Sequence, residues 1–223
     1  MLFRSSALHV LQVVAFLPQG VDHNKLSHLF PSIPNIQQIA DATRKMSLTH
    51  RNNDFITILT PIRLYLLHAD HSEFPLIKDV QSFYFEDLEP GDEGFGRGTW
   101  IVSEDDNVES LIARSDNYPD ACQACSDFLH VLYWHKRRMT TLGDKIRGLP
   151  ESDGKSAQLK WCCLRKVGRT AGDIGRLVDA TEINTAARSL ALAHNDPVLA
   201  TNSLRDLAAI SRRSGKYSDA VSQ

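Results

Sequence analysis

The fold is decided by the sequence GRLVDA at residues 175–180, which returns as GKYSDA at residues 215–220, 40 positions further along the chain. Both copies have the order glycine, basic residue, large apolar residue, any residue, Asp, Ala. A matching pattern of two large residues and a small one precedes each glycine at equal offsets: Leu164, Val167 and Gly168, then Leu204, Leu207 and Ala208. Such self-similarity indicates a repeat architecture.

The repeated spacing is the one that paired antiparallel helices need. Large residues at positions i and i+3 form the seam between two helices, and a glycine or alanine at i+4 lets the partner helix approach closely. The glycine that follows turns the chain into the next helix. Apolar residues at helical spacing from Ala121 to Trp134 extend the pattern backward, so we predict helical repeats over residues 119–223.

Residues 1–70 predict a domain of a different kind. Pro18 and Gly20 end a first amphipathic helix, Asp22 caps a second helix and Asn35 caps a third. The residues expected on their buried faces are Leu8, Leu11 and Ala15, then Leu26, Leu29 and Phe30, then Ile36, Ile39, Ala40 and Thr43.

A hairpin follows these three helices. Its predicted strands are residues 47–50 and 55–59, joined by the polar turn at residues 51–54. Pro61 stands in the first turn of a further helix. Three helices, a hairpin and a helix are the outline of a winged-helix domain.

Residues 71–118 are predicted to be an irregular linker with a connecting helix. A short helix is followed by an acidic stretch, Glu86 to Glu93, and by a glycine-rich segment from Gly91 to Gly98. Helical spacing resumes after Trp100 with Val108, Leu111 and Ile112.

Composition excludes several classes of protein. The 223 residues include 25 Lys and Arg against 27 Asp and Glu, a net charge of −2, so no overall field draws the chain to nucleic acid or lipid. The apolar stretch in MLFRSSALHVLQVVAFLPQG is too short to span a bilayer and has no cleavage site for a secreted protein. Four cysteines, two of them adjacent, do not form a disulfide framework. We therefore expect a cytoplasmic protein without a membrane partner.

The repeat resembles the tetratricopeptide repeat, in which two leucines and a small residue precede Gly-x-Tyr-x-x-Ala. The N-terminal part, with Ala15-Phe-Leu-Pro-x-Gly20, Met46-Ser-Leu48 and the stretch from Phe55 to Arg63, resembles the winged-helix subdomain that closes the NB-ARC module of NLR-type signalling NTPases, the STAND class. Large fungal proteins of this class join such a module to tetratricopeptide repeats. The resemblance implies a mainly α fold: a winged-helix-like domain with a small β-hairpin, followed by tetratricopeptide-like α-α repeats.

The nucleotide chemistry of that family is not carried by this sequence. The family's Met-His-Asp sensor aligns with Ile58, Leu59 and Thr60, and none of these side chains can replace the histidine. The family's phosphate loop and Mg-binding acids are expected upstream of Met1. Two stretches that imitate a phosphate loop, residues 91–99 and 148–156, lack the required ending or spacing and follow no strand. We expect no cofactor.

Other chemistry is weakly indicated. Cys122 and Cys125 have the spacing of two zinc ligands but lie in an apolar helical run, which favours buried thiols over a metal site. No nucleophile elbow marks a catalytic serine, so no catalytic residue is predicted. The expected recognition helix, residues 35–46, has only Arg44 and Lys45 as cations, which makes nucleic acid an unfavoured partner.

A partner site is predicted from the repeat register. In tetratricopeptide repeats the first helix of each pair lines a concave groove, one and five residues after the seam leucine. Counted from Leu164 and Leu204, these positions are Arg165, Arg169, Arg205 and Ala209, and the next turn adds Arg212 and Arg213. Asn202 stands where peptide-binding members of the family place an asparagine. We expect this face to bind an acidic peptide, for example residues 86–93 of the same chain, although the arginines of a solvated helix face give the same pattern.

The function that we expect is non-enzymatic protein interaction in signalling. Self-association is a further expectation, because the last helix, with Leu204, Leu207 and Tyr217, leaves an apolar face uncovered. One alternative is a fragment of an ATP- or ADP-binding NTPase whose nucleotide domain is missing from this chain. The other is a winged-helix DNA-binding protein.

Overall fold

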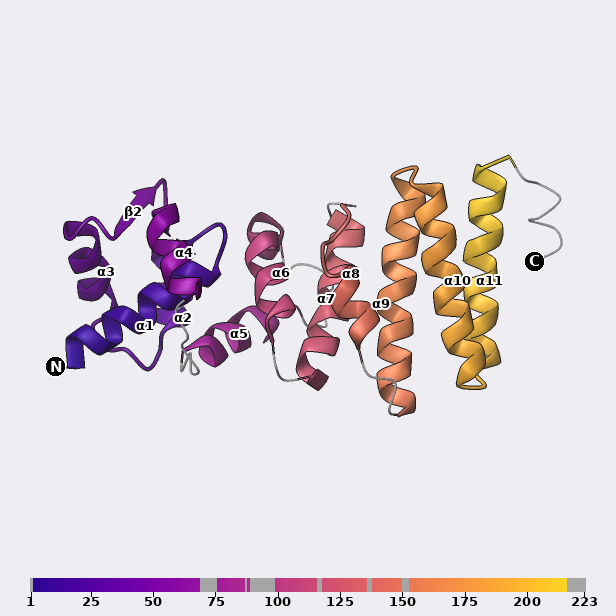
Figure 1. The fold of residues 1–223 in the computed structure, drawn as a ribbon, viewed down its shortest axis with the longest axis horizontal. Coiled ribbons are helices and arrows are strands. Elements are labelled where there is room, and N and C mark those ends of the chain that lie inside the picture. Colours follow the sequence, from indigo (N-terminus) through magenta and orange to yellow (C-terminus); the bar gives the residue numbers. More distant parts are fainter. Residues whose placement is uncertain are drawn as a thin grey trace. The chain divides into compact units, whose positions relative to one another are not determined.

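The computed structural model describes residues 2–68, 76–86, 88, 99–115, 118–135, 138–149 and 153–215. Two compact units are present: residues 1–89 with 99–114, and residues 90–98 with 115–223. The described residues are mainly helical (Figure 1). They include a small three-stranded antiparallel sheet in the first unit. No described helix is both long enough and apolar enough to cross a membrane.

The first unit begins with four helices and three short strands. In chain order these are α1 (Leu2–Phe16), β1 (Val21–Asp22), the 3-10 helix η1 (His23–Lys25), α2 (Leu26–Leu29), α3 (Ile36–Lys45), β2 (Thr49–Asn52), β3 (Phe55–Ile58) and α4 (Thr60–His68). The sheet has the order β1-β3-β2, and both pairs of neighbours are antiparallel. The predicted helices and hairpin are therefore present.

Strand β1 was not predicted from the sequence because it has only two residues. Its position depends on Gly20, which has a positive φ of 82° and whose added Cβ would lie 2.3 Å from the carbonyl oxygen of Ile56. Only glycine fits so close to the sheet. The chain can then turn directly after α1 and pair Val21 with Ile56.

Three local predictions in this unit need correction. Leu8 is 42% exposed, and the buried face of α1 instead carries Val10, Leu11, Val13, Val14 and Ala15. Asp22 caps η1 through the backbone N–H of Asn24, as expected, but the side chain of Asn35 accepts no capping bond. The hairpin turn is tighter than predicted, because β2 continues to Asn52 and leaves two residues, of which Asn53 has a positive φ of 55°.

The first unit also contains α5 (Ile77–Glu86), the 3-10 helix η2 (Thr99–Glu104) and α6 (Asp105–Ala113). These elements were expected in a linker, and they pack within the same unit as α1 to α4. The buried carboxylate of Glu104 links these elements to the start of the chain. Lys25 Nζ donates to one of its oxygens at 2.6 Å, and the Tyr84 hydroxyl donates to the other. Most of the acidic stretch at residues 86–93 lies outside the described residues.

The second unit contains α7 (Tyr118–His135), α8 (Gly143–Gly148), α9 (Gly154–Asp173), α10 (Leu177–Ala193) and α11 (Pro197–Arg213). Gly175, with a φ of +87°, turns α9 into α10, and Gly215 stands at the matching point after α11 with a φ of +77°. The turn between α10 and α11 uses Asn195, with a φ of +53°, in the same way. The second copy of the repeat motif, from residue 216 onward and including Tyr217, lies outside the described residues.

Small residues let α9 and α10 approach closely, as the repeat pattern predicts. A Cβ added at Gly168 would lie 2.4 Å from Nδ2 of Asn184, a fully buried side chain of α10. Leu164 and Val167 are buried beside it. In the second copy Leu207 is buried but Leu204 is only half-buried, so the seam is less complete on α11.

Candidate partner-binding groove

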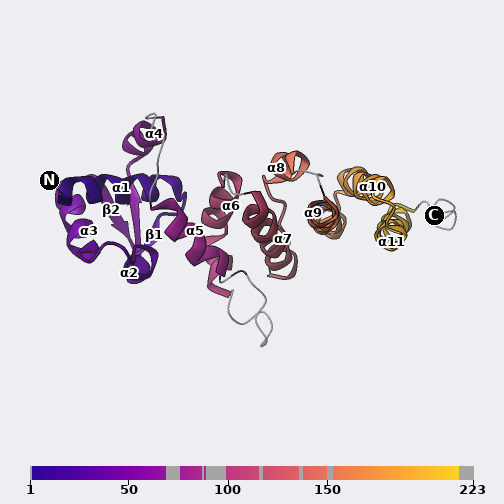
Figure 2. The same ribbon diagram turned by 90° about the horizontal axis from the view of Figure 1, so that it is seen from below.

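The predicted partner-binding residues lie on α9 and α11, two neighbouring helices of the second unit. Each helix starts at an aspartate that accepts a backbone N–H bond: Asp153 from Ser156 for α9, and Asp196 from Leu199 for α11. Helix α10 packs against both, and α9 also contacts α11 directly. Seen nearly end-on, α10 lies to one side of the line that joins α9 and α11 (Figure 2). The other side of α9 and α11 is thus not covered by α10.

A hollow of about 130 Å³ lies where α7, α9 and α11 meet. We call it the α9/α11 groove. Its lining comes from one residue of α7, three of α9 and four of α11: Tyr133; Arg169, Gly172 and Asp173; Asp206, Ala209, Ile210 and Arg213.

The structure brings together some of the predicted site residues and separates others. Arg169, Ala209 and Arg213 line the groove. Arg165, one turn before Arg169, reaches it by pairing with Asp206. The remaining three predicted residues, Asn202, Arg205 and Arg212, are not among the lining residues.

Two of the arginines at the groove are paired with aspartates, which corrects the expected wall of free guanidinium groups. Arg165 forms an ion pair with Asp206 and also lies over the ring of Trp161, with its guanidinium carbon 5.1 Å from the ring centre. Arg213 Nη1 lies 2.8 Å from Oδ1 of Asp173. Both aspartates are at least 85% buried, so the two arginines are held by internal carboxylates.

Arg169 differs from these two arginines. It is exposed, and its guanidinium carbon lies 5.2 Å from the ring centre of Tyr133, in cation–π contact. It has no carboxylate partner among the described residues. Because Asp206 and Asp173 are each neutralised by another arginine, the charge of Arg169 remains for an incoming anion.

One lining residue of the groove, Gly172, has no side chain. A Cβ added at Gly172 would meet Nη1 of Arg213 at 3.5 Å and Cγ1 of Ile210 at 3.7 Å, which are ordinary contact distances. Any larger side chain at this position would project among the lining residues. Ala171 on the same turn is fully buried and contacts Ala180 and Ile210.

Sequence reasoning missed Tyr133, Asp173 and Asp206. One signal for Asp173 was available, because Asp173 and Arg213 occupy equivalent positions in the two copies of the repeat, 40 residues apart. Opposite charges at equivalent positions of adjacent repeats can pair across the interface. No comparable signal identifies Tyr133, since α7 lies outside the repeated motif.

Cys122 and Cys125 are buried thiols, as the sequence predicted. Cys122, Cys125 and Cys163 are buried, and no group of three metal ligands occurs among the described residues. A hydrogen bond with Cys125, together with burial, raises the pKa of Cys163 well above its usual value. A protonated, enclosed thiol is a poor nucleophile and a poor metal ligand.

Lys166 lies beside these thiols on α9. Its Nζ donates to the backbone oxygen of Ser126 at 2.9 Å and to Oγ of the same residue at 3.3 Å, which ties α9 to α7. Burial lowers the pKa of Lys166. The contact positions α9 against the helix that carries Tyr133.

The positions aligned with the family's nucleotide sensor lie at the end of β3. Ile58 is buried in the sheet, while Leu59 and Thr60 are exposed where α4 begins. No family model matches this chain, and no curated protein or solved structure is significantly similar to it.

Proposed function

We propose that this chain is a non-enzymatic protein-interaction module of signalling, in which a winged-helix-like domain precedes tetratricopeptide-like repeats, as in the part of an NLR-type STAND protein that follows the nucleotide-binding core. The proposed partner is an acidic peptide bound in the α9/α11 groove. A reducing, cytoplasmic setting accords with the buried free thiols.

The element order of the first unit supports the winged-helix-like part of this proposal. Helix α1, strand β1, helices α2 and α3, and the hairpin β2–β3 follow one another along the chain, and β3 is the middle strand of the sheet. This is the arrangement expected of a three-helix domain with a hairpin wing.

The repeat geometry supports the tetratricopeptide-like part. Helices α9 and α10 are joined by a turn at a glycine with positive φ, and they approach closely where Gly168 meets Asn184. Helices α9 and α11 are the first helices of successive pairs in this scheme. They lie next to each other, as first helices that share a groove must.

The observation that carries the proposed binding site is Arg169. It is exposed, lies against the face of Tyr133, and stands between two buried aspartates that are already paired. A carboxylate that enters the groove can accept from this guanidinium without displacing an internal partner. The groove therefore fits an acidic side chain that arrives on an extended peptide.

The test uses a synthetic peptide with the sequence of residues 86–93, EDLEPGDE, and its neutral analogue QNLQPGNQ. We expect the acidic peptide to bind the full chain with a dissociation constant of about 100 μM at low salt, and more weakly at high salt. Arg169→Glu should weaken binding by at least about tenfold.

Lys155→Glu is the matched control. Lys155 is exposed on the same helix, about 21 Å along its axis from Arg169, and its reversal changes the net charge equally. Equal loss of binding in both variants, or equal binding of the neutral peptide, would contradict the proposed site. Circular dichroism of each variant shows whether the helices are intact.

A further inference from the structure

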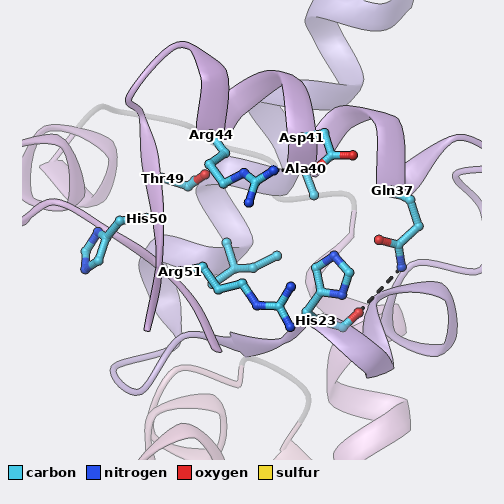
Figure 3. Close-up of a pocket in the computed structure, with 9 residues that line it drawn as sticks. His23, Gln37, Ala40, Asp41, Arg44, Thr49, His50 and Arg51 are labelled. Atoms are coloured by element: carbon cyan, nitrogen blue, oxygen red, sulfur yellow. Dashed lines mark hydrogen bonds and ion pairs between the residues drawn. The ribbon is translucent and has the colours of Figure 1, made fainter. Parts of the chain in front are cut away.

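A second hollow, of about 270 Å³, lies in the first unit between α3 and the hairpin (Figure 3). We call it the α3/β2 hollow. Its residues come from η1, α3, β2 and β3, so it is enclosed by elements that are well separated along the chain. It is independent of the α9/α11 groove, which belongs to the other unit.

Three nitrogen-bearing side chains from three elements point into this hollow. Figure 3 shows the guanidinium groups of Arg44 on α3 and Arg51 on β2, together with the ring of His23 on η1, directed toward the same space. His50 points away from it and bonds Thr57 Oγ1 at 2.8 Å. The convergence of donors from separate elements distinguishes a pocket from a row of charges on one helix face.

Most of the N–H groups of the two arginines are available. Arg44 has one ion pair, to Asp41 at 3.3 Å. Arg51 donates through Nε to the backbone oxygen of Asn53 at 2.9 Å and pairs with Asp54 at 3.1 Å. A guanidinium carries five N–H donors, so each group retains at least three.

The two aspartates position these arginines without neutralising them strongly. Both ion pairs are local i,i+3 contacts, and all four side chains are at least 39% exposed. Exposed pairs of this kind contribute little free energy. An anion with two charges can therefore compete with Asp41 and Asp54 for the guanidinium groups.

We propose that the α3/β2 hollow binds the phosphate group of a small phosphate monoester. The tetrahedral dianion has oxygens that point in several directions, so it can accept from Arg44 and Arg51 on opposite sides of the hollow, whereas a planar carboxylate matches one fork. Duplex DNA fits less well, because the ligand must enter a concave space whose lining includes Asp41 and whose Arg51 is paired with Asp54.

The experiment titrates the full chain with glycerol 3-phosphate and with inorganic phosphate, measured by isothermal calorimetry at low ionic strength. We expect a dissociation constant of about 1 mM for the monoester. Arg44→Gln and Arg51→Gln should each lower the affinity for the monoester by at least about fivefold, and the double variant should show no measurable binding.

Arg176→Gln is the matched control, because Arg176 also forms an exposed i,i+3 ion pair, with Asp179, on the other unit. It should bind the monoester like the unchanged chain. The proposal would be overturned if the Arg44→Gln, Arg51→Gln double variant still bound the monoester. An equal loss of binding in Arg176→Gln would also overturn it. So would tighter binding of duplex DNA than of the monoester, which would make this surface a nucleic-acid interface.

Discussion

Arg165 and Arg169 are one helical turn apart on α9, and their neighbours give them different roles. Arg165 is held by Asp206 and Trp161, so it contributes to the packing of α9 against α11. Arg169 is exposed and lies against the ring of Tyr133. Reversing the charge of Arg165 would leave the largely buried carboxylate of Asp206 unpaired, and a loss of binding in that variant would reflect a disturbed fold.

Gly168 and Gly172 on α9 offer a matched pair of substitutions that test the stability of the helix packing. Gly168→Ala should destabilise the chain by about 1–3 kcal/mol, because the new methyl group overlaps the buried side chain of Asn184. Gly172→Ala should stabilise it by up to about 1 kcal/mol, since alanine favours the helix and the space accepts a Cβ. Urea unfolding followed at 222 nm compares them, and equal effects of the two substitutions would contradict the close approach at Gly168.

Lys166 gives a prediction about pH. A lysine whose pKa is lower in the folded state than in the unfolded state binds fewer protons when folded, so it adds stability as pH rises toward its unfolded pKa of about 10.4. The difference in unfolding free energy between the unchanged chain and Lys166→Met should therefore increase between pH 7 and pH 10.

Denaturant unfolding at several pH values measures this difference. Lys160→Met is the control, because Lys160 lies on the same helix and its Nζ donates to the backbone oxygens of Arg147 and Leu149. If the difference in unfolding free energy between the unchanged chain and Lys166→Met stays constant or falls as pH rises, burial does not destabilise the charged form of Lys166.

At the scale of elements, Glu104 joins segments that are far apart in the sequence. Its carboxylate accepts from Lys25 and Tyr84, while Asn107 on α6 donates to the backbone oxygen of Gly20 at 2.9 Å. Burial, and then the negative charge of Glu104, raises the pKa of Tyr84, which keeps its hydroxyl protonated as the donor. This network holds α5, η2 and α6 to the turn between α1 and β1.

Glu104→Gln should destabilise the first unit by about 2–3 kcal/mol, because Lys25 loses its counter-ion and the Tyr84 hydroxyl loses a charged acceptor. Asp41→Asn, which removes an exposed ion pair in the same unit, should cost less than about 0.5 kcal/mol. Hydrogen exchange of the α6 amides reports the local free energy of opening. Similar exchange in both variants would contradict a structural role for the network.

Local signals predicted most of the elements. Pro18 and Gly20 ended α1, Asp22 capped η1, and Gly175 turned α9 into α10, because each acts through backbone chemistry within a few residues of its own position. The hairpin followed from its polar turn and apolar strands. These signals need no knowledge of the tertiary fold.

The features that escaped prediction depend on tertiary contacts. Strand β1 is too short to have a pattern, and it exists because β3 lies beside it. Glu104 and Lys25 are 79 residues apart, so nothing local relates them. In the groove, the register of α9 predicted Arg165 and Arg169 as partner-binding residues, but only the position of α11 shows that Asp206 pairs with Arg165.

The full chain is expected not to act on nucleotides. Leu59 stands where NLR-type proteins would have their sensor histidine, and no stretch of this sequence completes a phosphate loop, so ATP and ADP should show no affinity at the micromolar level. Calorimetric titration measures the affinity for ATP and ADP. The strongest nucleotide binding that we expect is weak, millimolar binding of a phosphate group in the α3/β2 hollow. Micromolar affinity or ATP hydrolysis by the pure chain would contradict it.

The proposed role of Arg169 in binding acidic peptides at the α9/α11 groove is tested most directly by a reciprocal charge reversal. Binding of EDLEPGDE and of a lysine-substituted peptide, KKLKPGKK, is measured on the unchanged chain and on Arg169→Glu by fluorescence anisotropy. We predict that Arg169→Glu lowers the affinity for the acidic peptide by about tenfold or more and raises the affinity for the basic peptide. If the preference for the acidic peptide is the same in both proteins, the acidic segment does not bind at Arg169 and the proposed site is wrong.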